Sequence, residues 1–403
     1  LKRMLINAVV KHVKKMVPAY SLPKAVKLND ALALGRGKAV REASPSSDEI
    51  AVLQYTGGTT GIAKGAMLTH RNIVANMLQC KALMGSNLDD GSEVLIAPLP
   101  LYHIYAFTFH CMAMMLIGNH NILITNPRDL PAMIKDLSKY RFTGFVGLNT
   151  LFVALCNNQE FRKLDFSALK VTLSGGMALQ LAAAERWKQV TGCSICEGYG
   201  LTETSPVASV NPIEHIQIGT IGIPAPSTLF KVINDDGQDL PQGEIGELCI
   251  KGPQVMKGYW QRQEATDEVI DAEGWFKTGD IGVIQEDGYI RIVDRKKDMI
   301  LVSGFNVYPN ELEDVLATLP GVLQCAAIGI PDEKSGEAIK VFIVVKPGES
   351  LTREQVMQHM HDNLTGYKRP KTVEFRDSLP TTNVGKILRR ELRDEELRKL
   401  GKK

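Results

Sequence analysis

Apolar residues recur along this chain with two different periods, and each period predicts a different kind of structure. Near the amino terminus, Leu5, Val9, Val13 and Met16 are spaced as on one face of a helix. After residue 47 the apolar positions gather instead into runs of strand length, separated by stretches of helical pattern. These runs fall at residues 49–55, 94–99, 121–126, 143–149 and 170–176. The alternation of strand and helix predicts a parallel α/β sheet.

Two later changes of texture divide the rest of the chain. From about residue 222, short strand patterns alternate with turn sequences such as NDDGQ and QEDGYI, which predicts a small β-rich unit. After Asp294 the pattern is that of a small α+β domain. We therefore expect a basic helix and linker at 1–46, the α/β part of a large domain at 47–222, a β-rich subdomain at 223–294, and a hinge with a mobile α+β domain at 295–403.

Composition and charge exclude several classes of protein. The chain has 403 residues, of which 44% are hydrophobic and 23% charged, as is usual for a globular protein with more than one domain. Its 47 basic and 45 acidic residues nearly cancel, so nothing favours a nucleic-acid partner. The seven cysteines are too sparse for a disulfide framework, which favours a reducing, cytoplasmic environment.

The basic amino-terminal segment has two interpretations. Residues 1–20 contain five Lys or Arg and no acidic residue, and the lysines interrupt the apolar run, which argues against a transmembrane span. A basic amphipathic helix of this kind can lie on an anionic membrane, as a peripheral contact with its cytoplasmic face. It can also be a connecting helix packed on its own domain, and we favour this second interpretation.

The stretch YTGGTTGIAKG at 55–65 has the composition of a phosphate-binding loop. Glycines permit close approach of the backbone, threonine hydroxyls and N–H groups donate hydrogen bonds, and Lys64 adds positive charge. A Walker A loop needs Ser or Thr directly after its lysine, but Gly65 stands there, which disfavours a P-loop nucleotidase. The loop lies between a predicted strand and a predicted helix, for which Thr69 is a suitable N-cap.

Five further motifs follow this loop in order. They are LPLYHI at 99–104, GYGLTET at 198–204, TGD at 278–280, IVDRKKDMI at 292–300 and NVGKILRREL at 383–392. Together they resemble the motif series of the adenylate-forming family of acyl-CoA synthetases, luciferases and peptide-synthetase adenylation domains. The stretch at 273–297 is similar to the signature of long-chain fatty-acid CoA ligases, above all the bacterial enzymes of fatty-acid degradation.

The resemblance implies an ATP-dependent ligase that acts in two steps. A long-chain fatty carboxylate attacks the α-phosphate of ATP, giving acyl-AMP and pyrophosphate, and the thiol of CoA then displaces AMP to form the thioester. Because the carboxylate and the polyphosphate repel each other, the site needs positive charge and Mg²⁺, with the reacting oxygens held in line. The implied cofactors and partners are ATP, Mg²⁺, CoA and a long-chain fatty acid, and a homodimer is kept open.

The roles of the family's catalytic residues carry over to matching positions. Lys386 would bridge the carboxylate and α-phosphate oxygens, and so stabilise charge that grows in the transition state. Thr202 would donate to the α-phosphate, and Glu203 would bind Mg²⁺, which prefers carboxylate oxygen. His103 would lie beside the substrate carboxylate, and Lys297 would be the hinge of the small domain.

The binding residues that the resemblance implies form three groups. Nucleotide binding falls to Thr56, Gly57, Gly58, Thr59, Thr60, Gly61, Lys64, Gly175, Gly176, Tyr199, Asp280 and Arg295. The acyl pocket would be lined by His103, Phe107, Val146, Gly147, Asn149 and Met177. After rotation of the small domain, Ser303, Gly304 and Phe305 would shape the CoA channel.

Several alternatives stay open at this point. A medium-chain or aryl CoA ligase would share these motifs, since chain length cannot be read from one sequence. Family members carry a substantial segment before the linker that opens this chain, and the first residue is Leu, so we expect a fragment or a gene model begun at the wrong codon. A truncated, non-catalytic nucleotide- or acyl-binding protein would keep the motifs, as would a membrane-docked interaction fragment.

Overall fold

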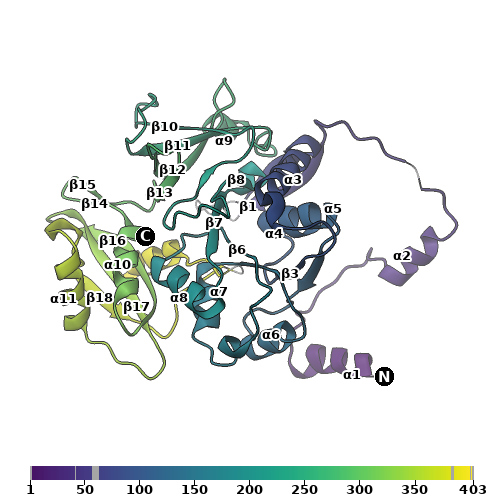
Figure 1. Cartoon of the computed structure of the whole chain (residues 1–403), viewed down its shortest axis with the longest axis horizontal. Helices are drawn as coiled ribbons and strands as arrows, with labels where there is room; N and C mark the ends of the chain where they lie inside the picture. Colours follow the sequence, from purple (N-terminus) through teal and green to yellow (C-terminus); the bar gives the residue numbers. More distant parts are fainter. Residues whose placement is uncertain (1, 41, 57–62, 383–384, 400, 402–403) are drawn as a thin grey trace. The chain divides into compact units, whose positions relative to one another are not determined.

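The computed structural model describes residues 2–40, 42–56, 63–382, 385–399 and 401. Residues Leu1–Pro45 and Ser46–Lys403 form two compact units. In the first unit, α1 (Lys2–Ala8) continues into a π-helix (Val9–Val13), and α2 (Leu28–Gly35) follows (Figure 1). The amphipathic stretch is therefore helical, with apolar side chains such as Leu5 and Val13 exposed.

A hairpin of two antiparallel strands, β1 (Ile50–Thr56) and β2 (Lys64–Thr69), opens the second unit. Thr56 pairs with Lys64 where the strands meet the Gly/Thr stretch. Of that stretch, Gly57, Gly58, Thr59, Thr60 and Gly61 lie outside the described residues. The predicted N-cap is confirmed: the Thr69 hydroxyl accepts the Asn72 N–H at 3.2 Å and starts α3 (His70–Met84).

The chain then builds a seven-stranded sheet in the order β4-β3-β5-β6-β7-β8-β9 (Figure 1). The strands from β4 to β7 are parallel, and the last two are antiparallel. This confirms the α/β fold expected from the sequence. The strands are β3 (Val94–Ala97), β4 (His120–Leu123), β5 (Gly144–Gly147), β6 (Val171–Ser174), β7 (Ile195–Gly200), β8 (Val207–Val210) and β9 (Ile223–Pro224).

Helices and short helical turns connect these strands. They are α4 (Ile104–Ala106), a π-helix (Phe107–Ala113), α5 (Met114–Leu116), α6 (Leu130–Leu137), α7 (Asn149–Cys156), α8 (Leu181–Thr191) and 3₁₀ turns at Gly85–Asn87, Phe161–Lys163 and Thr202–Thr204. In parallel sheets the loops that follow the carboxyl ends of the strands meet at one edge, where ligands usually bind.

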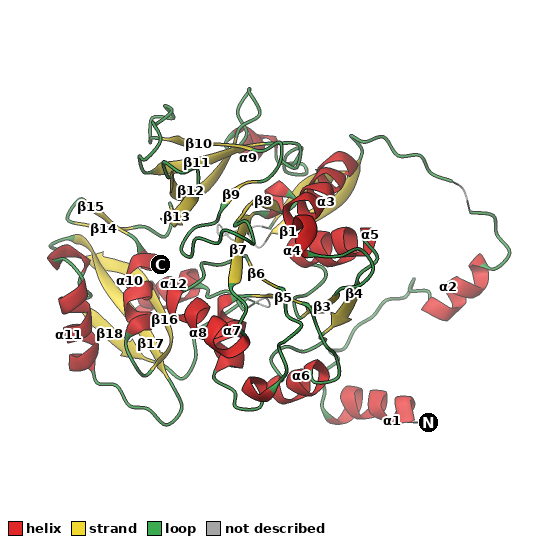
Figure 2. Cartoon of the chain, viewed as in Figure 1, coloured by secondary structure: helices red, strands yellow, loops and turns green. Residues whose placement is uncertain are grey.

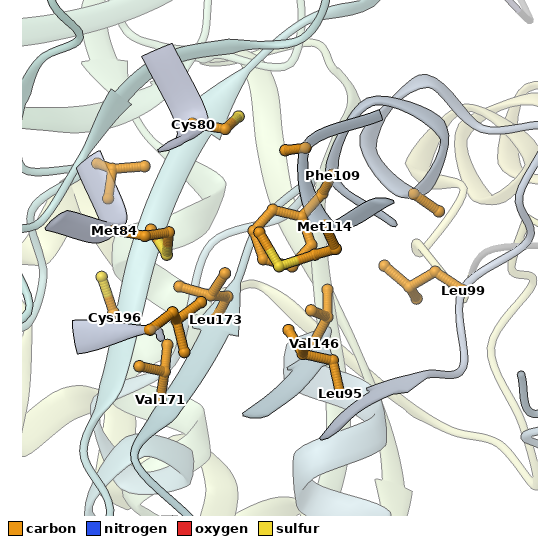
Figure 3. Packing of buried hydrophobic residues seen from close by; sticks show 14 of the residues in the cluster. Cys80, Met84, Leu95, Leu99, Phe109, Met114, Val146, Val171, Leu173 and Cys196 are labelled. Carbon is orange, nitrogen blue, oxygen red and sulfur yellow. The ribbon is translucent and has the colours of Figure 1, made fainter. Parts of the chain in front are cut away.

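Two clusters of buried side chains hold the sheet in place. In the cluster of Figure 3, Leu173 of β6 and Val146 of β5 pack with Met84 of α3 and Phe109 of the π-helix. The other cluster surrounds Trp187 of α8, whose ring lies 5.2 Å from that of Phe145 between centroids, and includes the helices α6, α7 and α8. These contacts fix the strands from which the site residues project.

The β-rich part is a four-stranded antiparallel sheet in the order β10-β11-β12-β13. Its strands are β10 (Leu229–Ile233), β11 (Gly246–Lys251), β12 (Phe276–Ile284) and β13 (Ile290–Arg295), and α9 (Gln263–Asp267) lies between β11 and β12 in sequence. Asp280 of β12 stands opposite Arg295 of β13.

The carboxyl-terminal part contains five strands in the order β15-β14-β17-β16, with β18 beside β17 (Figure 2). The elements are β14 (Ile300–Val302), β15 (Phe305–Val307), α10 (Pro309–Thr318), β16 (Val322–Asp332), β17 (Gly336–Val345), α11 (Arg353–Asn363), a 3₁₀ turn (Gly366–Lys368), β18 (Thr372–Phe375) and α12 (Arg389–Lys399). Lys340 of β17 is buried between Glu374 of β18 and Glu396 of α12, at 2.6 and 2.7 Å. This network ties α12, which follows Lys386, to the small sheet.

Candidate active site

A cavity of about 810 Å³ opens beside the carboxyl ends of β6 and β7. Its lining comes from the hairpin, the seven-stranded sheet, the β-rich sheet and the segment before α12, so residues far apart in sequence converge there. Most of the predicted catalytic, nucleotide-binding and hinge residues within the described parts are among the lining. They are Thr56, Lys64, His103, Gly175, Gly176, Tyr199, Thr202, Glu203, Arg295, Lys297 and Lys386.

Glu203 is held in place by residues of the loop before α9. Its carboxylate accepts the Tyr259 hydroxyl at 2.7 Å, and its backbone carbonyl accepts the Met256 N–H at 2.7 Å. The Nζ of Lys64 lies over the Tyr259 ring, 5.0 Å from its centroid, where a cation is attracted by the aromatic face. Burial, together with the Glu203 charge, raises the pKa of Tyr259, so this phenol stays a donor. The Gly/Thr hairpin and GYGLTET are thus connected through one tyrosine.

Tyr259 was missed by sequence reasoning. It stands in the stretch KGYW, outside every motif that we used, and nothing in its spacing points to the site. Only the fold places its hydroxyl against Glu203.

Asp280 lies beside the cavity and is only 2% exposed. One of its oxygens accepts the Tyr199 hydroxyl at 2.6 Å, and the other accepts the Arg295 Nε at 2.8 Å. A carboxylate has about four acceptor sites, so these two bonds leave capacity for a further donor such as a ribose hydroxyl. Burial and the Asp280 charge raise the pKa of Tyr199 well above its usual value. Tyr199, Asp280 and Arg295 therefore form one hydrogen-bonded chain.

Arg295, Lys297 and Lys386 form a cluster of cations in the cavity wall, whose lining also includes Lys64 and Lys277. Lys386 is accessible to solvent through the cavity, yet protein surrounds it, and this enclosure, followed by the charge of Arg295, lowers its pKa to about 8. Burial and the same Arg295 charge also lower the pKa of Lys297. Asp280 is the anion that pairs directly with Arg295 here. An excess of positive charge in the wall of a cavity favours the binding of an anion such as a phosphate.

His103 stands at the start of α4 and lines the same cavity. Its Nδ1 accepts the Tyr105 N–H at 3.3 Å, which fixes the orientation of the ring. Burial, followed by the charge of Lys386, lowers the pKa of His103. The imidazole is therefore neutral near pH 7 and lies close enough to Lys386 to respond to its charge.

The apolar part of the cavity differs from the predicted acyl pocket. Phe107, Val146, Gly147, Asn149 and Met177 are not among the lining residues. Instead, the apolar wall comes largely from α3, the π-helix and the strands. Its members include Cys80, Leu83, Met84, Leu99, Phe109, Leu148, Leu173 and Val210.

Packing explains the difference. Val146 is fully buried within the sheet cluster, and a side chain at Gly147 would meet the Phe152 ring at 2.8 Å. Phe107 packs in a separate cluster with Ile104 and Met256. The motifs do not show on which face of its strand or helix each residue lies. They also do not show that α3 packs against the sheet.

The residues predicted for the CoA channel lie elsewhere in this arrangement. Ser303 and Gly304 form the turn between β14 and β15 with positive φ angles of 52° and 83°. Phe305 is 56% exposed and stacks on Tyr367, with 4.8 Å between the ring centroids. None of the three lines the cavity. The carboxyl-terminal part, from β14 onward, contributes Thr382 and Lys386 to it.

The carboxylate of Glu203 in the cavity wall fits the usual manner of Mg²⁺ binding. Among the described residues, no group of three or more His, Cys, Asp or Glu side chains could hold a metal ion. Mg²⁺ is commonly bound through one or two carboxylates together with substrate phosphates, rather than in a cage of protein ligands. Glu203, at the cavity wall near Lys64, fits that pattern.

The comparison with protein families decides the membership of this chain. Residues 4–260 match the AMP-binding enzyme family, and residues 311–386 match the AMP-binding enzyme C-terminal domain. The chain belongs to the AMP-binding enzyme family. In the described part of this AMP-binding enzyme, no helix combines the length and apolar character needed to cross a bilayer.

Curated relatives and solved structures support the assignment. This AMP-binding enzyme is 55% identical over 395 residues to a long-chain-fatty-acid–CoA ligase of Escherichia coli O6:H1, covering 98% of this chain and 70% of the relative. It is 54% identical over 401 residues to the ligase of that name from Haemophilus influenzae, covering 99% and 71%. The crystal structure of ATP-bound MatB from Rhodopseudomonas palustris superposes with a TM-score of 0.81 at 31% identity, covering 91% of this chain and 72% of that one.

Proposed function

We propose that this protein activates a long-chain fatty acid with ATP to acyl-AMP and then transfers the acyl group to CoA, releasing AMP and pyrophosphate. The observation that carries the proposal is that five cationic side chains, Lys386 among them, and an apolar wall share one cavity. The cations suit the phosphates and the carboxylate, and the apolar wall suits a hydrocarbon chain. The long-chain ligases that this chain resembles over nearly its whole length support that choice of substrate.

In the first half-reaction, Lys386 neutralises charge at the reacting centre. Its ammonium lies in the cavity with Arg295 and Lys297, so the oxygens of the carboxylate and the α-phosphate can approach each other against a positive wall. Thr202 donates to the α-phosphate, and His103 lies by the carboxylate as a neutral ring. Because Lys386 must be protonated, its lowered pKa makes this step sensitive to mildly alkaline pH.

Pyrophosphate and nucleotide are held by two further groups of residues. Lys64 and Thr56 flank the Gly/Thr stretch and bind the outer phosphates. Asp280 and Arg295 bind the ribose, while Gly175, Gly176 and Tyr199 bound the adenine side. Glu203 holds Mg²⁺, which supplies charge neutralisation on the phosphates.

The acyl chain extends along the apolar wall of the cavity. Cys80, Leu83 and Met84 of α3 face Leu173 and Phe109 there, and none of these side chains carries a charge. Their volume sets how long a chain fits.

The second half-reaction requires the small domain to move. Lys386 occupies the cavity here, while Ser303, Gly304 and Phe305 lie away from it. A rotation at Lys297 withdraws Lys386 and brings the 303–305 turn to the cavity to form the CoA channel. This motion assumes the division into parts at 47–222, 223–294 and 295–403, which stays a prediction.

The first unit, Leu1–Pro45, would bind the surface of a membrane. Lys11, Lys14 and Lys15 lie within or just after the helical segment of Lys2 to Val13, beside exposed apolar side chains. Such a surface suits an anionic bilayer, which is also where fatty acids partition. Binding to phosphatidylglycerol vesicles, lost when the three lysines are changed to Glu, tests it. The formation of a homodimer stays a prediction, and light scattering, which measures the molar mass in solution, tests it.

The deciding experiment is fatty-acid-dependent exchange of labelled pyrophosphate into ATP with Mg²⁺. Acids of short, medium and long chain and one aryl acid are compared, with Lys386→Ala beside the parent. A maximum with long acids that collapses in the variant supports the proposal. A maximum with medium-chain or aryl acids assigns the alternative substrate class, and no exchange from folded protein assigns a non-catalytic binding role.

A further inference from the structure

The loop between β6 and α8 is anchored by two side chains, one from a neighbouring strand and one from a helix. It runs from Gly175 to Gln180. The Oε1 of Glu197 accepts the N–H of Leu179 at 3.0 Å, and the Oδ1 of Asn149 accepts the N–H of Gln180 at 3.0 Å. Two consecutive backbone donors are thereby tied to the middle of β7 and to the first residue of α7.

The other end of this loop is a wall of the cavity. Gly175 and Gly176 are both lining residues. A Cβ at Gly175 would lie 3.2 Å from the Tyr105 ring and 3.4 Å from the carbonyl oxygen of Gly198. Since the backbone is packed this closely between a ring and a strand, a shift of a few tenths of an ångström at the anchored end changes the shape of the wall.

Glu197 does not belong to the cavity itself. It is 8% exposed, and it is not a lining residue, although its neighbours Cys196 and Gly198 are. Residues alternate between the two faces of a strand, so its carboxyl points to the face that carries Leu179. Within the described residues, no Lys or Arg forms an ion pair with it.

The surroundings keep this carboxyl uncharged near neutral pH. Burial raises the pKa of Glu197 to about 8, and the negative charge of Asp314 on α10 adds to the effect. The hydrogen bond from Leu179 acts in the opposite direction but does not outweigh burial. A neutral carboxyl still offers a carbonyl oxygen as acceptor, which is what the Leu179 N–H uses.

We propose that Glu197 is a positioning residue for the nucleotide: by accepting the Leu179 N–H it fixes the loop that carries Gly175 and Gly176. The assignment rests on the proposed function, because it takes the glycine wall as the adenine side. What the loop needs from Glu197 is an acceptor at the right distance, and the negative charge is dispensable. Asn149 serves the next N–H in the same way.

Three variants test this assignment. Glu197→Gln keeps the acceptor and removes the charge, Glu197→Leu removes both, and Glu185→Leu is the matched control on the exposed side of α8. The KM for ATP, the KM for the fatty acid and kcat are measured by pyrophosphate exchange, with thermal unfolding followed in parallel. Binding of AMP by calorimetry adds a reading that needs no turnover.

The acceptor hypothesis gives a specific pattern. Loss of one buried acceptor should raise the KM for ATP and the Kd for AMP about tenfold in Glu197→Leu, with kcat and the KM for the acid within about twofold. Glu197→Gln and Glu185→Leu should stay within about twofold of the parent throughout. A merely structural role would instead lower the folded fraction, and with it kcat, at unchanged KM.

The contrary results are distinct from failure of the proposed function. Nucleotide affinity that is unchanged in Glu197→Leu, or reduced equally in Glu197→Gln, overturns the positioning role. If Glu197→Leu does not fold, Glu197→Asp, whose carboxyl is one methylene too short to reach Leu179, takes its place under the same criteria. Absence of exchange in the parent sinks the proposed function, while AMP binding still tests the loop.

Discussion

The Tyr259 hydroxyl donates a hydrogen bond of 2.7 Å to the carboxylate of Glu203, under the ammonium of Lys64. A residue from outside the motifs therefore sets the direction of the carboxylate that we assign to Mg²⁺. Lys64, which we assign to the outer phosphates, lies with its Nζ over the ring of the same tyrosine. One phenol thus links the metal and phosphate sides of the cavity.

Tyr259→Phe should weaken the use of Mg²⁺ while leaving the stacking of Lys64 intact. Loss of a hydrogen bond to a charged group is worth about 1.5–3 kcal/mol, part of which water restores in an open cavity. We expect the Mg²⁺ concentration for half-maximal exchange to rise about fivefold to tenfold. Tyr140→Phe, at a partly exposed ring, is the control. An unchanged Mg²⁺ requirement would contradict this role.

Lys386 should impose an alkaline limit on the first half-reaction. Its pKa is lowered to about 8, so the required ammonium is present below that pH and is lost as the pH rises through it. Exchange rates between pH 6.5 and 9.5 should fall above about pH 8. In Lys386→Arg the guanidinium stays charged, so the rate should be lower but flat over this range. A parent profile that is flat to pH 9.5 would rule this out.

Lys386→Ala should lower the rate of exchange by about 10²–10³, as removal of a preorganised charge from a transition state does. The second half-reaction, started from synthetic acyl-AMP and CoA, should change by less than about threefold, because in the proposed mechanism Lys386 leaves the cavity before it. Equal losses in both half-reactions would show that Lys386 serves the fold. The two rates measured on one protein preparation decide the matter.

Asp280→Asn should raise the KM for ATP more than Tyr199→Phe does. The first change leaves the Arg295 guanidinium, which is enclosed with two other cations, without its direct anionic partner. Truncating one side of such a pair costs about 2 kcal/mol or more, so we expect a rise of at least about thirtyfold. Tyr199→Phe removes one neutral donor and should give about fivefold. Asp236→Asn, at an exposed turn, is the control, and the reverse order would refute the arrangement.

Met84 should limit the length of the acyl chain. It lines the apolar part of the cavity from the last turn of α3. Met84→Ala should shift the preference toward acids longer by about one or two methylenes, each worth about 1–3 kcal/mol of discrimination, and Met84→Trp should shift it toward shorter ones. Met115→Ala, at an exposed methionine, should leave the preference unchanged. A chain-length series in pyrophosphate exchange measures the shift, and identical profiles would remove α3 from the acyl site.

Lys340 gives a prediction about stability. Its side chain is 7% exposed and lies between the carboxylates of Glu374 and Glu396, which also pair with Arg376 and Lys399. Lys340→Ala removes two charge-assisted hydrogen bonds but leaves each carboxylate another cationic partner, so we expect a loss of about 1.5–3 kcal/mol in the free energy of unfolding of the small domain. Lys135→Ala at an exposed position should cost less than about 0.5 kcal/mol. Urea unfolding followed by tryptophan-independent far-UV signals tests the difference.

The sequence predicted the fold well where local rules decide it. The parallel strands were expected because apolar runs of strand length alternate with helical patterns, and the Thr69 cap was expected because a threonine stands directly before the helical stretch HRNIVANMLQCKAL. The residues of the ordered motifs converge on one cavity, as the resemblance implied. Their roles stay predictions until the variants are measured.

Sequence reasoning was weaker where long-range packing decides. We expected the acyl pocket to be formed by residues that are close to the motifs in sequence. In the structure, residues of α3 such as Met84 line the apolar wall of the cavity instead. Tyr259 and Glu197 act through contacts with residues 56 and 18 positions away, respectively. Neither hydrophobic periodicity nor a motif predicts such a contact, because it depends on how two elements that are far apart in sequence pack against each other.

The cavity wall begins at Gln54 and is completed by Lys386. On the ribosome, the sheet and its hairpin are available for folding long before this lysine has been made, because domains fold as they emerge from the amino-terminal side. A chain whose translation stops between Arg295 and Lys386 therefore contains the residues that we assign to nucleotide binding but lacks the lysine that we assign to chemistry. Such a product should exchange pyrophosphate into ATP at least about 10²-fold more slowly than the parent.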